Sequence, residues 1–164
     1  MLCFAYGSNL SLRRLQARLP SARCVAVACL EEHRLVFHKC SERDRSAKCD
    51  AWYSGNPRDR VWGMVAEIAD KEKPRLDAIE GLGRGYEQKQ VIVTTREGEA
   101  LEAQMYYATA IDDHLRPFDW YKQHVLVGAR EHGLPEDYVA GIESVPAMED
   151  PNPRRRKREL SIYP

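Results

Sequence analysis

The sequence lacks an excess of charge of either sign, because 25 basic residues balance 25 acidic residues among its 164 positions. A neutral chain offers no broadly basic surface, so we expect no binding to nucleic acid. Its apolar runs are short, well below the ~20 residues that a membrane-spanning helix needs. The first residues show no basic stretch followed by an apolar one, which is the pattern of a secretory signal. These absences predict a cytoplasmic protein with no membrane partner.

Cysteine is present but lacks the spacing of a disulfide framework or a metal site. The number of cysteines is odd, no C-x-x-C occurs, and all lie in the first third of the chain, at Cys3, Cys24, Cys29, Cys40 and Cys49. A small disulfide-rich domain would carry a denser, even-numbered set, so we expect free thiols. His38, Cys40 and Cys49 match no common zinc spacing. We therefore expect no metal and no cofactor.

Motifs for a hydrolase or a nucleotide site are missing as well. Ser8 lies outside any G-x-S-x-G sequence, and no H-E-x-x-H occurs. Gly81, Gly83 and Gly85 have the spacing G-x-G-x-G, and a strand rather than a helix is expected after them. That spacing and that context both exclude a dinucleotide loop. Any chemistry must therefore come from other residues.

Hydrophobic patterning predicts more strands than helices, in an irregular order. Helices are expected over residues 12–19, 70–80 and 119–133, with a short one after Pro135. Strands are expected over residues 2–6, 25–30, 34–38, 49–53 and 61–68, followed by a hairpin over residues 88–107. Strict alternation of strand and helix is absent. The predicted fold class is α+β, a small mixed sheet curved or closed into a β-barrel, with flanking helices outside.

The length of the chain fits one domain. We expect this domain to cover residues 1–149 and a basic C-terminal extension to cover residues 150–164. The extension contains the run RRRKR at positions 154–158. A run of like charges is typical of a solvated segment, and the alternative is docking onto an acidic surface elsewhere.

The first candidate for a binding site is a predicted strand that turns into a helix at Gly7. Such a turn leaves backbone N–H groups without partners at the helix start, where the helix dipole also attracts anions. Gly7 allows the turn and the close approach of a ligand, and Ser8 and Asn9 add side-chain donors. A ligand carboxylate is the expected occupant. The alternative is a capped helix without a ligand.

The second candidate is Glu80, the last residue of a predicted helix before Gly81. It follows Leu76 by four positions, so the two side chains share one side of the helix. The negative end of the helix dipole and apolar neighbours both raise the pKa of a carboxyl group. A raised pKa suits a general base that works near neutral pH. The alternative is an ordinary solvated glutamate.

Four motifs occur in a fixed order along residues 2 to about 145. They are FAYGSNL at 4–10, VWG at 61–63, the segment 76–86 that begins LDAIEG, and the segment from Trp120 through GAREHGLP at 128–135 to Tyr138. In this order and spacing, the sequence resembles the γ-glutamylcyclotransferase family. The resemblance implies an enzyme with a small mixed β-barrel that releases 5-oxoproline from a γ-glutamyl amino acid or amine, without a metal.

The resemblance also implies roles for particular residues. Glu80 takes the place of the family's catalytic glutamate. The glutamyl-binding strand and loop correspond to Cys3, Phe4, Ala5, Tyr6, Gly7, Ser8 and Asn9. The family's binding tyrosine corresponds best to Tyr106, although the neighbouring Tyr107 leaves this assignment open by one residue. The expected partner is a small γ-glutamyl substrate, and the oligomeric state stays open, with a homodimer as one alternative.

Three other functions stay open from the sequence. The substrate's leaving group is an amine in one alternative and an amino acid in the other. A non-catalytic relative of the same fold would bind a γ-glutamyl ligand or a protein, although such a module has no need for a carboxylate base at Glu80. A nucleic-acid accessory protein would use the basic extension, but the neutral remainder of the chain argues against it.

Overall fold

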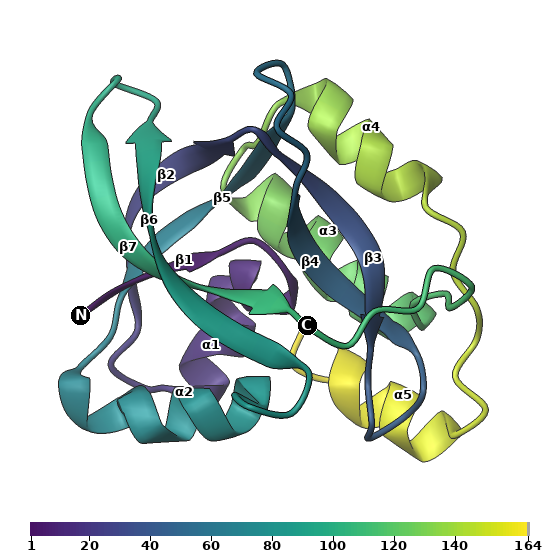
Figure 1. Cartoon of the computed structure of the whole chain (residues 1–164). Coiled ribbons are helices and arrows are strands. Elements are labelled where there is room, and N and C mark those ends of the chain that lie inside the picture. The colour runs from purple at the N-terminus through teal and green to yellow at the C-terminus, as the bar shows by residue number, and fades with distance from the viewer. Residues whose placement is uncertain (164) are drawn as a thin grey trace.

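The computed structural model describes residues 1–163, and its centre is a closed barrel of five strands (Figure 1). In spatial order these strands are β1 (Leu2–Ala5), β5 (Arg60–Glu67), β2 (Arg23–Glu31), β6 (Tyr86–Thr95) and β7 (Ala100–Ala108). Neighbours pair antiparallel except β1 and β7, which close the barrel in parallel with Cys3 opposite Gln104. The predicted mixed barrel with flanking helices is confirmed.

Alternation of side chains gives the barrel its apolar interior. Along β6, Val91, Val93 and Thr95 are buried, whereas Ile92 between them is exposed. Successive side chains of a strand point to opposite faces, so this pattern places one face of β6 in the core. A separate two-stranded sheet, β3 (His33–Cys40) with β4 (Ala47–Tyr53), lies beside the barrel.

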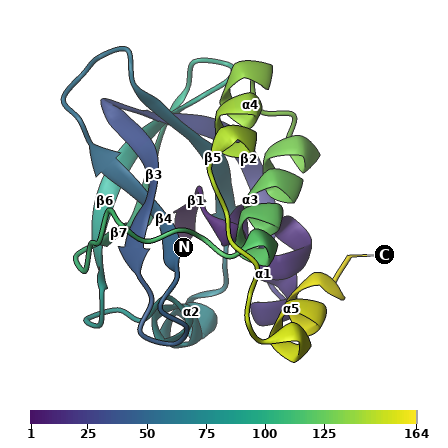
Figure 2. The same cartoon turned by 90° about the vertical axis from the view of Figure 1, so that its right-hand side faces the viewer.

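The helices cover the barrel on one side and at one end. Figure 2 shows α1, α3, α4 and α5 gathered along one side of the strands, with α2 at the lower end. Their bounds, with those of two 3₁₀ turns, are η1 (Ser8–Leu10), α1 (Leu12–Arg18), η2 (Asp70–Glu72), α2 (Lys73–Glu80), α3 (Asp119–Glu131), α4 (Glu136–Ser144) and α5 (Pro153–Leu160).

Local chemistry explains where the two helices nearest the site begin and end. The Ser11 hydroxyl accepts a hydrogen bond from the Arg14 backbone N–H, which caps α1. Pro74 occupies the first turn of α2, where its missing N–H leaves no bond unmade. Gly81 ends α2 with φ of 76°, a left-handed conformation that favours glycine. This stop places Glu80 at the mouth of the barrel.

The C-terminal segment differs from the expected solvated extension. Asn152 caps α5 by accepting a hydrogen bond from the Arg155 backbone N–H at 3.0 Å. Ion pairs of 2.6 Å then attach the segment to the rest of the chain, joining Arg156 to Asp119 and Glu159 to Arg14. Asp150, which pairs with Arg155 inside the segment, also accepts a hydrogen bond from the Trp120 indole N–H at 2.7 Å. The alternative, docking onto acidic side chains elsewhere, therefore describes this segment better. Residue 164, the last of the predicted extension, lies outside the described residues.

Candidate active site

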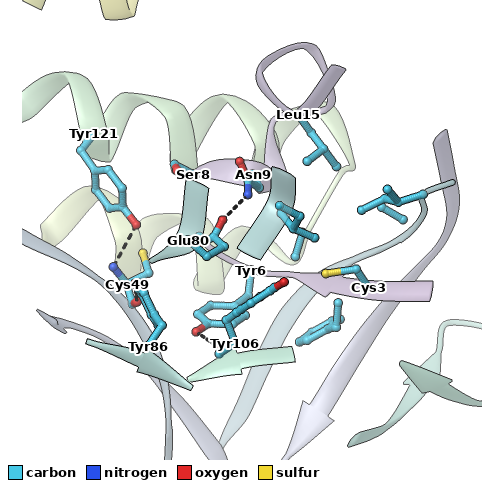
Figure 3. Close-up of a pocket in the computed structure, with 16 residues that line it drawn as sticks. Cys3, Tyr6, Ser8, Asn9, Leu15, Cys49, Glu80, Tyr86, Tyr106 and Tyr121 are labelled. Carbon is cyan, nitrogen blue, oxygen red and sulfur yellow. Dashed lines mark hydrogen bonds between the residues drawn. The ribbon is translucent and has the colours of Figure 1, made fainter. Parts of the chain in front are cut away.

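A pocket opens where β1 leaves the barrel and enters η1 (Figure 3). It encloses about 520 Å³ of space not filled by atoms, part of which is open to solvent. We call it the inner pocket. All of the site residues expected from the sequence line it, namely Cys3, Phe4, Ala5, Tyr6, Gly7, Ser8, Asn9, Glu80 and Tyr106. The remaining lining residues are Leu15, Cys49, Ala66, Ile68, Leu76, Tyr86 and Tyr121.

The turn after β1 presents backbone donors to this pocket. Leu10 donates its backbone N–H to the Gly7 carbonyl at 2.9 Å, whereas the N–H groups of Ser8 and Asn9 start the turn and have no partner within it. Helix α3 holds the turn from behind at Gly128, where an added Cβ would lie 2.4 Å from the carbonyl carbon of Leu10. Only glycine permits this approach, so the position of the turn depends on a residue of α3.

A chain of hydrogen bonds fixes the Glu80 carboxylate. Arg18 donates from Nη1 to Asn9 Oδ1 at 2.7 Å, and Asn9 donates from Nδ2 to Glu80 Oε1 at 2.5 Å. An arginine side chain is only a donor, so it holds the amide oxygen of Asn9 and turns the amide nitrogen toward Glu80. Residues from α1, η1 and α2 therefore orient one carboxylate group, and Figure 3 shows the contact between Asn9 and Glu80.

Two opposing effects act on the pKa of Glu80. Burial raises the pKa of its carboxyl group, and the positive charges of Arg18, Arg14 and Lys39 oppose that rise, as does the hydrogen bond from Asn9. Burial is the larger effect, so the pKa lies above the ordinary value for glutamate. The direction agrees with the one predicted from the helix end and its apolar neighbours.

Tyrosine hydroxyls in the wall of the inner pocket form hydrogen bonds with backbone groups. Tyr6 donates to the carbonyl oxygen of Tyr106 at 2.6 Å, and Tyr86 donates to that of Cys49. The hydroxyl of Tyr121 accepts the backbone N–H of Cys49 at 2.9 Å. Burial raises the pKa of Tyr6, Tyr86 and Tyr121, so all three stay protonated. The wall is therefore rigid and uncharged.

The two adjacent tyrosines of β7 point to different places. Tyr106 lines the inner pocket and donates its hydroxyl to Asp77 Oδ1 at 2.5 Å. Tyr107 is only half-buried, does not line the pocket, and lies under the Lys89 ammonium, 5.4 Å from its ring centre. Asp77 is also paired with Lys73, which leaves it less free than Glu80 to accept another proton.

Cys3 contributes an apolar surface rather than a reactive thiolate. It is buried in β1, and burial together with the nearby Glu80 charge raises its thiol pKa to about 12. The thiolate is the nucleophilic form of cysteine. At neutral pH the Cys3 side chain is therefore a protonated, weakly polar part of the pocket wall.

Sequence reasoning missed Arg18, as it missed the pocket tyrosines Tyr86 and Tyr121. Arg18 lies in the polar part of the amphipathic helix α1, where an arginine is ordinarily solvated. Arg14 and Arg18 are four positions apart and so share one face of the helix, which is the only local signal that could have indicated them. Their acceptors, Asn9 and Glu159, come from other elements.

Known proteins resemble this chain in sequence. The model of the AIG2-like family matches residues 60–142. A γ-glutamylcyclotransferase of Mus musculus is 34% identical over 155 residues, which cover 88% of this chain and 78% of the mouse protein. The Bos taurus γ-glutamylcyclotransferase is 33% identical over 151 residues, with the same coverage of both chains. The chain belongs to the γ-glutamylcyclotransferase family.

A solved structure agrees with this family. A γ-glutamyl cyclotransferase structure superimposes with a TM-score of 0.85 at 29% identity, covering 96% of this chain and 98% of the other. The predicted family is thus confirmed, and with it the prediction of an enzyme of this type. The roles of individual residues, the absence of a cofactor and the leaving group stay predictions.

Two further observations concern residues 1–163. Their His, Cys, Asp and Glu side chains form no group of three that could hold a metal ion. None of the helices in this part of the chain combines the length and the apolar character needed to cross a membrane.

Proposed function

We propose that the protein releases 5-oxoproline from a γ-glutamyl compound in which the substrate's own α-amine is the nucleophile and Glu80 is the general acid and base. The observation that carries the proposal is the oriented, partly buried carboxylate of Glu80, facing a pocket whose other lining residues are uncharged. A single negative charge in such surroundings complements a single substrate ammonium. No cofactor is required for this chemistry.

The turn at residues 7–9 supplies the contacts for the glutamyl group. Backbone N–H groups of Ser8 and Asn9 suit the α-carboxylate or the oxyanion that develops on the γ-carbonyl. The tyrosine-lined wall bounds the carbon chain of the substrate. Binding must fold this chain so that its nitrogen meets its own γ-carbon, and a rigid pocket favours such a folded conformation.

The proposed reaction moves two protons from the substrate's α-ammonium to the departing nitrogen. The substrate α-amine has a pKa near ~8, so it is mostly ammonium at neutral pH. Glu80 accepts a proton, and the free amine attacks the γ-carbonyl carbon to form the ring C–N bond. The γ-amide C–N bond then breaks, and Glu80 returns this proton to the departing nitrogen. Glu80 next accepts the second excess proton from the ring nitrogen and passes it to the released amine, which leaves as an ammonium. The products are 5-oxoproline and the released amino acid or amine, with no water consumed.

An isotope experiment tests the proposal. The protein is incubated with γ-glutamyl-alanine, a γ-glutamyl amine and glutathione in H₂¹⁸O, and the products are examined by mass spectrometry. We expect 5-oxoproline that carries no ¹⁸O, because the nucleophile is nitrogen. Labelled glutamate would indicate hydrolysis instead. Absence of any product from the whole panel would contradict the proposal and favour a non-catalytic binding protein.

A further inference from the structure

A second cavity adjoins the inner pocket on the far side of Glu80. We call it the outer cavity. Ser8, Glu80, Tyr86 and Tyr121 line both cavities, so the two meet around the carboxylate. Helices α1, α2 and α5 and the β3–β4 connection form the walls of the outer cavity. The docked C-terminal segment is therefore part of this wall.

The outer cavity is strongly basic although the chain is neutral. Eight of its lining residues are lysines or arginines and four are acidic. The whole chain carries 25 residues of each sign, so this excess is a local property. A cavity lined by one sign of charge between protein walls concentrates ligands of the opposite sign.

Half of these basic residues have no carboxylate partner. Four are paired, as Arg14 and Arg158 with Glu159, Lys48 with Asp44, and Arg155 with Asp150. The other four, Arg18, Lys39, Arg43 and Arg84, form no ion pair anywhere in residues 1–163. Arg18 donates to Asn9 and Arg43 to the carbonyl oxygen of Ala78, both neutral acceptors.

Lys39 is the most buried of the four basic residues without an ion pair in residues 1–163. Only 6% of its surface is exposed, and its ammonium group lies 4.8 Å from the centre of the Tyr86 ring. Within the described part of the chain, this ammonium has no hydrogen-bond acceptor. Lysine is almost never this buried unless it is paired. Burial lowers its pKa, which a bound anion would offset.

The position of the outer cavity assigns it to one part of the substrate. The glutamyl group occupies the inner pocket, and its γ-amide must reach Glu80 so that the departing nitrogen receives a proton. Whatever is attached to that nitrogen continues past Glu80 into the outer cavity. An amino acid with an uncharged side chain brings one carboxylate there, whereas four basic residues without an ion pair in the described chain line the space.

We infer that the outer cavity binds the leaving group and selects γ-glutamyl substrates whose leaving group carries two or more carboxylates, such as an acidic amino acid or a short γ-linked glutamyl chain. The inference rests on the proposed function and names the substrate class within it. Leaving groups without a carboxylate are the poorest substrates, because they leave the cations unpaired.

A series of substrates with increasing charge tests the inference. The series is γ-glutamyl-methylamide, γ-glutamyl-alanine, γ-glutamyl-glutamate and γ-glutamyl-γ-glutamyl-glutamate, whose leaving groups carry none, one, two and three carboxylates. At low salt we expect kcat/KM for 5-oxoproline release to rise about fivefold with each carboxylate, the value of one contact between opposite charges in water. Salt should reduce this rise, because it screens such contacts.

Charge-removing variants locate the effect. Arg84→Gln and Lys39→Met should each lower kcat/KM by about fivefold on γ-glutamyl-glutamate and by less on γ-glutamyl-methylamide. Arg84 is exposed, so its variant keeps the test valid if Lys39→Met does not fold. Arg58→Gln is the matched control, because Arg58 lies in the β4–β5 loop at the opposite end of the molecule from α2 and α5 (Figures 1 and 2). It should behave as wild type on every substrate.

The possible failures are distinguishable. Equal kcat/KM across the series, with 5-oxoproline formed, would overturn the inference and leave the proposed function intact. An Arg84→Gln loss of the same size on all four substrates would also overturn it, because a charge-specific contact cannot act on the methylamide. Absence of 5-oxoproline from every substrate would overturn both the inference and the proposed function.

Discussion

The inner pocket and the outer cavity meet at Glu80 and share Ser8, Tyr86 and Tyr121, but their other lining residues differ. Glu80 is the one acidic or basic residue among the inner lining residues that the structure describes, and the rest are apolar, aromatic or polar without charge. The outer cavity is lined by eight basic side chains. A site built from backbone and tyrosines recognises shape, whereas one built from long cations recognises charge. Under the proposed function, the difference predicts strict selection of the glutamyl group and selection by charge of the leaving group.

The replacement Glu80→Gln tests the shared residue and has the largest expected effect. Glutamine keeps the size of the side chain but cannot accept a proton at neutral pH. General acid–base catalysis contributes ~10²–10⁴-fold, so we expect kcat to fall by about that factor. The melting temperature should hold or rise slightly, because a carboxylate at a helix C-terminus opposes the helix dipole. Steady-state kinetics and a melting curve measure both effects.

Glu87→Gln is the control for this experiment, since Glu87 is exposed on β6 and lines neither cavity. A folded Glu80→Gln enzyme with nearly unchanged kcat would remove Glu80 as the base. A higher KM with unchanged kcat would instead mean that Glu80 binds the ammonium only by charge. The next candidate for the base would then be Asp77, whose carboxylate already accepts a hydrogen bond from Tyr106 and pairs with Lys73.

Gly7→Val tests the inner pocket alone. A Cβ at position 7 would lie 3.1 Å from Cys49 Cβ and 3.3 Å from the Tyr121 hydroxyl, so the turn or these two pocket-wall groups must shift. Overpacking typically costs about 1–3 kcal/mol, and we expect KM to rise by roughly 5- to 150-fold because binding must restore the original positions against this cost. Gly141→Val is the control, because nothing lies within 4 Å of a Cβ there. An unchanged KM in folded Gly7→Val would contradict binding at this turn.

Arg18→Gln tests the connection between the two cavities. Glutamine can still donate to Asn9 but carries no charge. Ionised Glu80 is the active form, so kcat/KM is lost as the pH falls through its pKa. The charge of Arg18 favours the ionised form, so its removal should raise the pKa of Glu80 and move the low-pH loss of kcat/KM to higher pH. We call this low-pH part of the profile the acidic limb.

Arg18→Lys should return the acidic limb toward the wild-type position, because it restores the charge. The pH dependence of kcat/KM measures both variants. A limb that stays in place in Arg18→Gln would show that Arg18 acts only through the hydrogen bond to Asn9.

The inner pocket could be predicted from the sequence more fully than the outer cavity. The turn at Gly7 and the helix end at Glu80 are local patterns, and the strand and helix that carry them follow from hydrophobic spacing. The contacts that join them are not local, since Asn9 and Glu80 lie 71 positions apart. The wall formed by α5 depends on the Arg14–Glu159 pair across 145 positions. From the sequence alone, a basic run predicts a solvated segment. Its acidic partners lie far away along the chain, and only the fold brings them close.

Tyr106→Phe has the smallest expected effect and resolves the one residue that the sequence left ambiguous. The Tyr106 hydroxyl is held by Asp77, so its loss loosens a ring that bounds the glutamyl group. A hydrogen bond between side chains contributes about 0.5–1.5 kcal/mol, which predicts a roughly 2- to 10-fold loss in kcat/KM. Tyr107→Phe is the matched control and should change kcat/KM by less than about twofold, because Tyr107 lies outside the pocket. A larger loss in Tyr107→Phe than in Tyr106→Phe would move the binding role to Tyr107 and would require β7 to turn its other face to the substrate.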